Sequence, residues 1–371
     1  MTELADLTRD LVSIPSHEAE AAAGDYMAEW LREHTDADVT RDDAGAADGR
    51  GGNVFARKGG ENADARTLAL VGHHDVVPPD ASQVTDDGGY VVSEEDGRLY
   101  GRGSADMKGA DAAMLLAFRD AETSPDCELV FISFVGEELG GIGARYAIDE
   151  GFAPDHALVA EGSTGYASPP GILDVAVAHK GRRGSTITAQ GSAAHASDPH
   201  LGENAVYRAC DAVDIVRNLD WPRTEVAGEE LEGSVVVTEI EGGSAWNVVP
   251  ESCAVTVDER TVPGERAALE RVEQIDGVSW TVEQDLPPMR CGDDEFADAV
   301  LSAVQAVQSG DGQHVTKPHA TDAGWLAQAG TECIICGPSE PGEAHTKTES
   351  VSLDVLETCY EAYLELAESW S

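Results

Sequence analysis

The alternation of short apolar segments with longer amphipathic ones constrains the fold of this chain more than any other feature. Apolar runs of the length of buried strands occur at residues 67–71, 129–135, 157–160 and 332–336. Patterns expected for helices occur at residues 2–11, 17–33, 110–118, 296–307 and 356–364. Buried strands between amphipathic helices are typical of an α/β sheet covered on both faces. Residues 36–61, rich in Gly and Asp, are expected to be mostly loop.

The middle of the chain has a different order of elements. Strand-like segments occur at residues 175–189, 234–240, 254–259 and 278–283, with helical stretches at 206–216 and 265–273. The order strand, helix, strand, strand, helix, strand is typical of a ferredoxin-like α+β layer. A chain of 371 residues usually forms more than one core. We therefore expect an inserted ferredoxin-like domain at 179–287, between two parts of a larger domain at 1–178 and 288–371.

The charge of the chain restricts where it can work and what it can bind. It has 70 acidic and 24 basic residues, a net charge of -46, and the acids are spread along the whole chain. So much like charge destabilises a compact state at low salt. At about 1 M salt the Debye length falls to roughly 3 Å, which screens the repulsion. We therefore expect a halophilic source, and no binding to nucleic acid or to an anionic membrane.

The start of the chain and its cysteines indicate a cytoplasmic location. Residues 1–10 have no basic stretch and no apolar core of a signal peptide. No apolar run approaches the ~18 residues of a membrane span. The seven cysteines are an odd and scattered set, which favours reduced thiols. Cys333 and Cys336 lie in an apolar strand without a second pair nearby, so core packing is expected for them.

A His-rich turn follows the first predicted strand. Residues 72–78 read Gly-His-His-Asp-Val-Val-Pro. In extended geometry His73 and Asp75 share a face, while His74 points the other way. His73 could bind a metal while Asp75 holds its ring. A polar turn with a hydrogen-bonded His explains this segment equally well when it is taken alone.

Further acids and one His follow other predicted strands or precede predicted helices. Asp106 stands before the helix at 110–118, where it could be a simple cap. Glu137 and Glu138 follow the strand at 129–135, either as a solvated pair or as a metal ligand beside a free base. Glu161 follows the third strand, and His345 precedes the last helix. Each signal is weak alone, but in α/β sheets catalytic groups gather at the carboxyl ends of strands. Their joint occurrence therefore predicts one site.

Three of these segments together resemble one family of metallohydrolases. They are Gly-His-x-Asp-Val-Val-Pro at 72–78, Gly-Arg-Gly-x-x-Asp-Met-Lys-Gly at 101–109 and Gly-Glu-Glu at 136–138. The chain is similar to acetylornithine deacetylase, succinyl-diaminopimelate desuccinylase, aminoacylase and glutamate carboxypeptidase, from residue 11 to the last helix. The resemblance implies a catalytic α/β domain with a mixed sheet flanked by helices. It also implies that the inserted ferredoxin-like domain is a lid or a dimerisation domain.

The same resemblance implies two divalent metal ions, with Zn²⁺ expected and Co²⁺ as the alternative. His73 and Glu161 would bind one ion, and Glu138 and His345 the other. Asp106 would bridge the two ions. Imidazole and carboxylate ligands suit zinc.

The resemblance also assigns roles outside the metal ligands. Glu137 would be the general base, and Asp75 would orient His73. His195, in Gly-Ser-Ala-Ala-His-Ala-Ser at 191–197, would reach the oxyanion either across a dimer or by lid closure. Asn247 and Arg260 would contact polar groups of the substrate, since Arg suits a bidentate grip on a carboxylate.

Several activities fit such a site. The leading hypothesis is removal of the acyl group from a small, carboxylate-bearing N-acyl amino acid. The alternatives are carboxypeptidase or dipeptidase action, or release of lysine or ornithine from an acidic carrier protein. A metal-free binding relative is disfavoured because all five ligand positions and Glu137 are filled. Gly162-Ser163 stands where deacylases of the family often have Pro-Thr or Pro-Ser, which weakens the substrate assignment.

Folding should depend on salt. Because the net charge is -46, the melting temperature should rise as KCl is increased from about 0.1 M to about 3 M and the repulsion is screened. Thermal melts across a KCl series measure this. A melting temperature that does not change over the series would contradict the halophilic interpretation.

Overall fold

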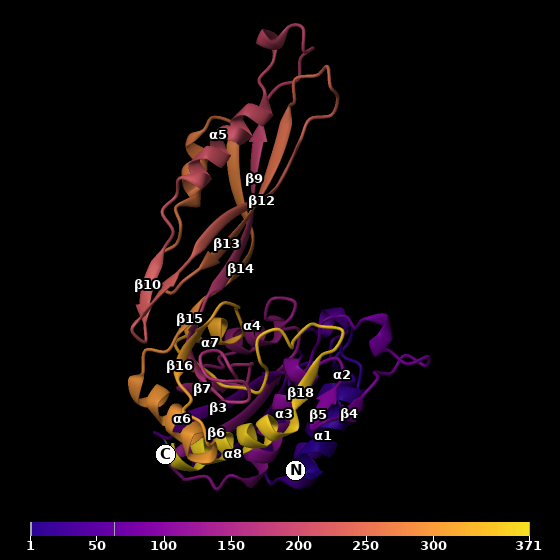
Figure 1. Cartoon of the computed structure of the whole chain (residues 1–371), viewed down its shortest axis with the longest axis vertical. Helices are drawn as coiled ribbons and strands as arrows, with labels where there is room; N and C mark the ends of the chain where they lie inside the picture. Colours follow the sequence, from indigo (N-terminus) through magenta and orange to yellow (C-terminus); the bar gives the residue numbers. More distant parts are fainter. Residues whose placement is uncertain (1, 63, 371) are drawn as a thin grey trace. The chain divides into compact units, whose positions relative to one another are not determined.

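The computed structural model describes residues 2–62 and 64–370, and the chain forms two compact units. Unit 1 comprises the chain up to Ala178, Arg290–Lys317 and the chain from Thr321 onward. Unit 2 comprises His179–Met289 with Pro318–Ala320. Figure 1 shows the large sheet of unit 1 with its helices, and the smaller sheet of unit 2 with its own helix.

Unit 1 contains a nine-stranded mixed sheet. Its order is β1 (Asp38–Arg41), β2 (Val54–Gly59), β6 (Cys127–Phe134), β3 (Arg66–His73), β7 (His156–Val159), β17 (Glu332–Ile335), β8 (Val175–His179) and β15 (Met289–Arg290), with β16 (His314–Lys317) beside β8. The four central strands β6, β3, β7 and β17 run parallel. β1 pairs antiparallel with β2, β2 with β6, and β8 with β17. The carboxyl ends of the parallel strands therefore meet at one edge of the sheet, and the predicted mixed α/β sheet is confirmed.

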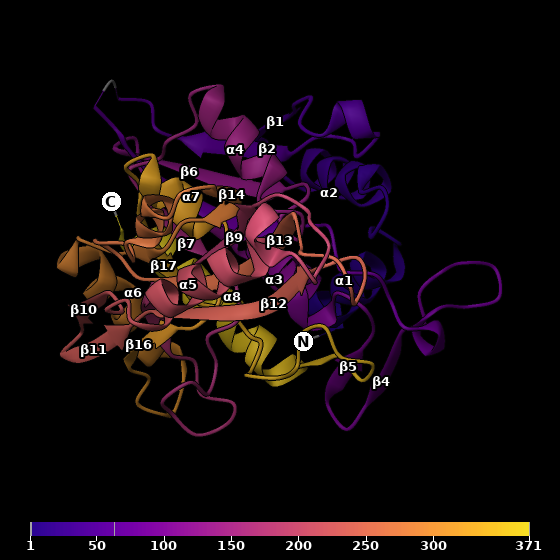
Figure 2. The same cartoon turned by 90° about the horizontal axis from the view of Figure 1, so that it is seen from above.

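Helices flank this sheet. They are α1 (Thr2–Ser13), α2 (Ala21–His34), α3 (Gly109–Asp120), α4 (Ile142–Asp149), α6 (Asp294–Val307), α7 (Ala323–Gln328) and α8 (Leu353–Ser369). α3 packs against α1, α8, β3 and β6, and its residues Gly109–Phe118 are all buried. Apart from Asp111, this stretch of α3 is apolar on every side, and such a helix is expected to be enclosed in this way. α2 packs on β1 and β2, and α4 on β6, as the view from above shows (Figure 2).

A small second sheet of unit 1 joins two distant segments. Its order is β18 (Ser350–Ser352), β5 (Arg98–Tyr100) and β4 (Ser93–Glu95). β18 pairs antiparallel with β5, and Ser350 lies opposite Tyr100. Two segments adjoin this pairing: residues 101–109, which carry one of the three motifs, and residues 342–349, which contain His345. Short helical turns complete the unit: η1 (Ala46–Asp48), η2 (Ala81–Gln83) and η3 (Ser104–Lys108).

Unit 2 has an antiparallel sheet of order β12 (Ser234–Gly242), β13 (Ser252–Thr261), β9 (Gly181–Gln190) and β14 (Val278–Leu286). α5 (Ala205–Arg217) packs on this sheet, and β10 (Arg223–Val226) pairs with β11 (Glu229–Glu232) in a hairpin. A further turn is η4 (Pro199–Leu201). The buried core joins α5 to the sheet through Ala209, Ala212, Val255 and Val257.

Four details differ from the expectations. Residues 36–61 contain β1 and β2, because Val54 and Ala56 are buried in the pairing with β6 despite the polar composition around them. α2 begins at Ala21 rather than at residue 17. The strand expected at 175–189 is two strands, β8 and β9, that separate at Lys180. The helix expected at 265–273 is the short 3-10 helix η5 (Leu269–Gln274), which still buries Leu269 and Val272.

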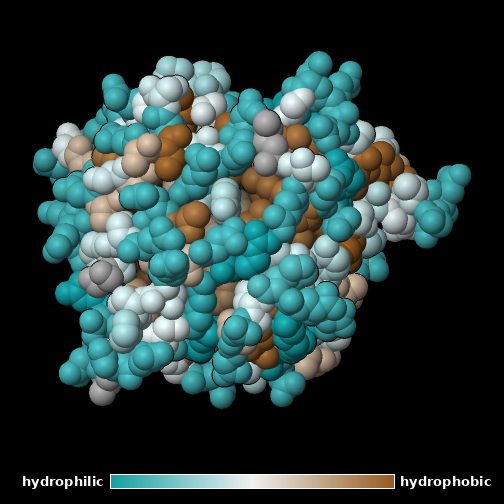
Figure 3. Space-filling model, turned by 90° about the horizontal axis from the view of Figure 1, so that it is seen from below, coloured by the Kyte–Doolittle hydropathy of each residue, from teal (hydrophilic) through white to brown (hydrophobic). Residues whose placement is uncertain are grey.

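The surface agrees with the composition. The face in Figure 3 is dominated by hydrophilic residues, and apolar ones are scattered over it. None of the helices in the described ranges has the length and apolar character needed to cross a bilayer.

Candidate metal centre

The centre is built at the carboxyl end of β3. His73 is the last residue of β3 and is buried, as is Asp75 two residues later. The His73 Nδ1 atom lies 3.1 Å from the Asp75 backbone oxygen and 3.3 Å from Asp75 Oδ1. The Asp75 carboxylate also accepts hydrogen bonds from the backbone N–H groups of Glu137, at 3.0 Å, and Glu138, at 3.1 Å. Asp75 therefore holds both the imidazole of His73 and the turn that follows β6.

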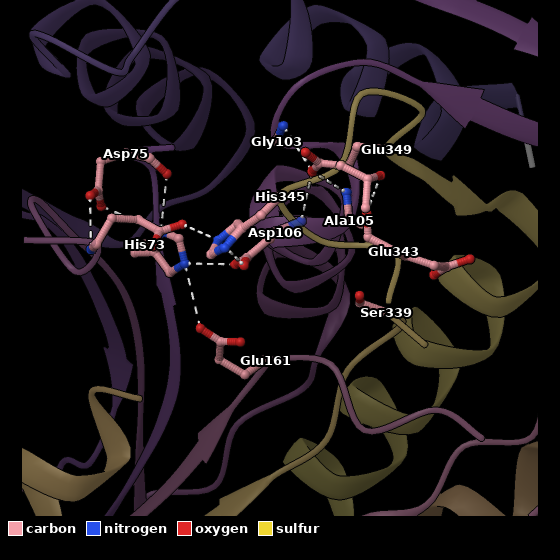
Figure 4. Close-up of polar contacts among 12 residues, drawn as sticks. His73, Asp75, Gly103, Ala105, Asp106, Glu161, Ser339, Glu343, His345 and Glu349 are labelled. Atoms are coloured by element: carbon pink, nitrogen blue, oxygen red, sulfur yellow. Dashed lines mark hydrogen bonds and ion pairs between the residues drawn. The ribbon is translucent and has the colours of Figure 1, made fainter. Parts of the chain in front are cut away.

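Asp106 lies between two imidazoles. Its Oδ1 atom is 3.1 Å from His73 Nε2, and its Oδ2 atom is 3.1 Å from His345 Nε2 (Figure 4). The two carboxylate oxygens thus face two different histidines, one at the end of β3 and one in the segment before β18. This is the arrangement of a carboxylate that can bridge two cations.

Each imidazole has a second carboxylate beside it. Glu161 Oε1 lies 3.5 Å from His73 Nε2. Glu138 Oε1 lies 2.8 Å from His345 Nε2. Glu161 follows β7, and Glu138 follows β6, so two strands parallel to β3 supply these side chains.

Glu137 also reaches the centre. One ligand atom each of His73, Glu137 and Glu161 lie within 4.8 Å of one another, and the same holds for His73, Asp106 and Glu138. The turn that directs Glu137 begins at Gly136, whose φ of 62° is in the left-handed region. This geometry brings together all five predicted ligands and the predicted base.

The electrostatics of the centre couple its groups strongly. Burial would lower the pKa of His73, but Asp106, Asp75 and Glu161 together raise it well above its usual value. Hydrogen bonds with Asp106 and Glu138 raise the pKa of His345 to about 10. Burial and then the charge of Asp322 raise the pKa of Glu137 well above its usual value. In the metal-free protein the surrounding carboxylates therefore favour the protonated, cationic form of both histidines.

The residues present fit two divalent cations. Two imidazoles and one lysine face a larger set of carboxylates: Asp75, Asp106, Glu137, Glu138, Glu161 and Asp322. Both carboxylate oxygens of Asp322 are buried and have no hydrogen-bond partner among the described residues. Buried carboxylates are costly unless cations balance them. Imidazole nitrogens and carboxylate oxygens are also the ligands that zinc accepts in open sites.

The predicted site residues of unit 2 occupy two places. His195 and Asn247 lie on adjacent loops, since His195 forms a β-bridge with Val248 and the Ala196 N–H donates to the Asn247 backbone oxygen at 2.9 Å. Both side chains are exposed. Arg260 lies near the other end of β13, eight residues beyond Ser252, which is roughly 27 Å along a strand. Its Nε atom donates to Asp258 at 2.8 Å.

Comparison with known proteins assigns the family. Residues 69–369 match Peptidase family M20/M25/M40. The chain belongs to this family. The family predicted from the three motifs is thereby confirmed, because relatives with the names given by the resemblance also match.

Two of these relatives and one solved structure illustrate the match. Acetylornithine deacetylase of Myxococcus xanthus is 32% identical over 83% of this chain and 81% of its own length. Succinyl-diaminopimelate desuccinylase of Bordetella avium is 27% identical over 100% of this chain and 99% of its own length. The crystal structure of the aminopeptidase PepT from Bacillus cereus superposes with a TM-score of 0.79 at 19% identity, covering 99% of this chain and 97% of that one. This M20/M25/M40 member is therefore a hydrolase that acts on amide bonds.

Two polar residues of the centre were missing from the predicted set. Lys317, at the end of β16, is buried with its Nζ atom 3.6 Å from Glu161 Oε2. Asp322 is buried before α7, and burial raises its pKa to about 8. A signal for Lys317 existed, since it is one of only five lysines in the chain. Its proximity to Glu161 could not be foreseen because more than 150 residues separate the two in sequence.

Metal binding to the metal-free protein should release protons. The pKa of His345 is about 10, and that of His73 is also well above its usual value, so both imidazoles carry a proton at neutral pH. A histidine must be neutral to bind a metal, so filling the centre near pH 7.5 should release at least the two imidazole protons, and metal affinity should rise with pH. Calorimetric Zn²⁺ titrations in buffers of different ionisation enthalpy measure the release. Binding heats that do not depend on the buffer would contradict this protonation state.

Proposed function

We propose that this protein is a dimetal amidohydrolase that removes the acyl group from a small N-acyl amino acid. The observation that carries the proposal is the position of Asp106, whose two oxygens face His73 and His345 separately at 3.1 Å each. The acetylornithine deacetylase and desuccinylase relatives support the choice of substrate class, since they align with most or all of the chain.

The proposed ligand sets follow the contacts. One ion would be held by His73 and Glu161, and the other by Glu138 and His345, with Asp106 shared between them. Two such ions lower the pKa of a water molecule and polarise the scissile carbonyl group. Zn²⁺ fits this ligand set best, and Co²⁺ is the alternative. Asp75 would keep the His73 ring oriented through its contact with Nδ1.

Glu137 would carry the proton. Its carboxylate lies beside the imidazole of His73 and the carboxylate of Glu161, and its backbone N–H is fixed by the hydrogen bond that it donates to Asp75. From this position Glu137 would take a proton from the attacking water and return it to the leaving amine, which converts a poor leaving group into a neutral one. His195 would meet the oxyanion, and Asn247 and Arg260 would bind polar groups of the substrate, in the roles that the resemblance implies.

Peptidase action is the second candidate. It is supported by the family itself, whose matched pattern is that of peptidases. The same water attack and the same proton transfer by Glu137 would cleave a peptide bond, so the centre alone does not select between the two substrate classes. The choice depends on the groups that surround the acyl and amine sides of the scissile bond.

The two adjacent glutamates should respond differently to loss of charge. Glu137→Gln should keep both metals and lose at least the ~100-fold in turnover usually attributed to general acid–base catalysis. Glu138→Gln should instead lower occupancy of one metal site, because an amide oxygen is a neutral and poorer ligand than a carboxylate. Metal content and turnover, measured on both variants at one salt concentration, decide the assignment. An empty site in Glu137→Gln with full metal in Glu138→Gln would reverse the two roles.

A substrate panel tests the reaction class. N-acetyl amino acids, N-succinyl amino acids and dipeptides should be compared by kcat/KM in high salt with added Zn²⁺ or Co²⁺. We expect an N-acyl amino acid to have the highest value. Faster hydrolysis of dipeptides than of any N-acyl amino acid would favour the peptidase candidate instead.

A further inference from the structure

A buried carboxylate outside the ligand set holds the turn that carries Asp106. Glu349 is 1% exposed and directly precedes β18. Its Oε1 atom accepts hydrogen bonds from the backbone N–H groups of Gly103, at 2.9 Å, Ala105, at 3.1 Å, and Asp106, at 3.2 Å (Figure 4). One carboxylate oxygen thus gathers three amide groups of the segment that ends at the bridging aspartate.

The second oxygen of Glu349 is bound as well. Oε2 forms an ion pair with the guanidinium group of Arg102, which is itself buried. Since both partners are removed from water, salt screens this pair far less than it screens the charges of the surface. The arrangement therefore persists at the salt concentrations that the rest of the protein is expected to need.

The backbone around Glu349 fixes its position. The Gly101 N–H donates to the Glu349 backbone oxygen at 3.1 Å, and the pairing of Ser350 with Tyr100 continues this contact into the β18–β5 ladder. Gly103 has a φ of 84°, and a left-handed residue of this kind turns successive amides toward one point, where they form a cradle for an anion. In this protein the anion in the cradle is the side chain of Glu349.

Glu349 thereby connects two proposed metal ligands that are far apart in sequence. His345 lies four residues before it on the same segment, and Asp106 is bound to it through its own backbone N–H. Asp106 would be shared by both proposed ions. His345 belongs with Glu138 to one ligand set, whereas His73 and Glu161 of the other set come from β3 and the end of β7. Removing the carboxylate would leave three buried amides and a buried guanidinium without their partner, so the turn would have to move.

We propose that Glu349 is a positioning residue that holds Asp106 and His345 in register, so that it sets the metal affinity of the Glu138–His345 site without touching substrate or metal. This inference rests on the proposed dimetal function. It predicts an asymmetric defect: the Glu138–His345 site weakens more, because two of its three proposed ligands, Asp106 and His345, are tied to Glu349. The other site shares only Asp106 with Glu349, and its His73 and Glu161 keep their own positions at the ends of β3 and β7.

The test compares two substitutions in the same segment. Glu349→Gln keeps the size of the side chain and removes its charge. Glu343→Gln is the matched control, because Glu343 pairs with Arg98 and accepts the Glu340 N–H at 2.9 Å. Within the described part of the chain, its carboxylate forms no hydrogen bond or ion pair with the Asp106 turn. Co²⁺ should be titrated into metal-free protein in competition with a chelator. Glu349→Gln should bind the first ion with little change and the second about 10- to 100-fold more weakly, as is usual for groups that support metal ligands.

Kinetics and stability give independent readouts. For Glu349→Gln, kcat should fall with substrate KM nearly unchanged, and a large excess of Co²⁺ should restore much of the turnover. Glu343→Gln should match the wild type in affinity for both ions. If Glu349→Gln does not fold, Glu349→Asp takes its place: it keeps the charge for Arg102 but draws the carboxylate back from the amides, and the same asymmetric loss is expected.

The outcomes separate this inference from the proposed function. In one outcome, the wild type and both Glu349 variants bind two ions with equal affinity, and the variants differ only in a lower melting temperature. That result would overturn the positioning role and leave the dimetal proposal intact. Equal weakening of both ions would also overturn it. A wild-type protein that binds no second ion would contradict the dimetal function itself.

Discussion

Crowding of carboxylates at one edge of the sheet is the constraint on which the rest of the centre depends. The parallel strands β3, β6 and β7 end side by side, and each delivers acids to the same small volume. Such a cluster is unfavourable unless positive charge compensates it. In the metal-free protein the protonated His73 and His345 supply that charge, and two divalent cations would supply more of it. The same repulsion that makes the site costly to fold therefore makes it a strong cation site.

Backbone hydrogen bonds to buried carboxylates keep this crowded site in shape. Asp75 accepts the N–H groups of Glu137 and Glu138, and Glu349 accepts three N–H groups up to Asp106. In both cases a carboxylate that is not a proposed metal ligand accepts the backbone N–H of a residue that is one: Asp75 binds Glu138, and Glu349 binds Asp106. The backbones of these ligands are hydrogen-bonded to two different carboxylates, Asp75 and Glu349. Electrostatic repulsion between the ligand side chains therefore cannot easily move them apart.

The sequence predicted most of the centre because local patterns carry it. His73, Asp106, Glu137, Glu138 and Glu161 each follow a buried strand or precede a buried helix, so these patterns predicted that the residues gather at one site. Their roles as ligands and base came from the resemblance to the metallohydrolase family. Contacts between distant segments could not be inferred. The bonds of Asp75 to the turn after β6 span about 60 residues, and those of Glu349 to the Asp106 turn span more than 240. Lys317 was missed for the same reason, whereas Thr321-Asp322 resembled an active-site loop of the family without a role being assigned to Asp322. β1 and β2 were missed because of their polar, Gly-rich surroundings.

The central claim is that Asp106 is shared between two metal ions, and anomalous diffraction tests it most directly. Crystals grown at high salt with Zn²⁺ should show two anomalous peaks roughly 3.5–4 Å apart. One peak should lie against His73 and Glu161, the other against Glu138 and His345, with one oxygen of Asp106 on each. A single peak at this centre, or zinc bound only at the surface while these side chains stay dispersed, would contradict the account.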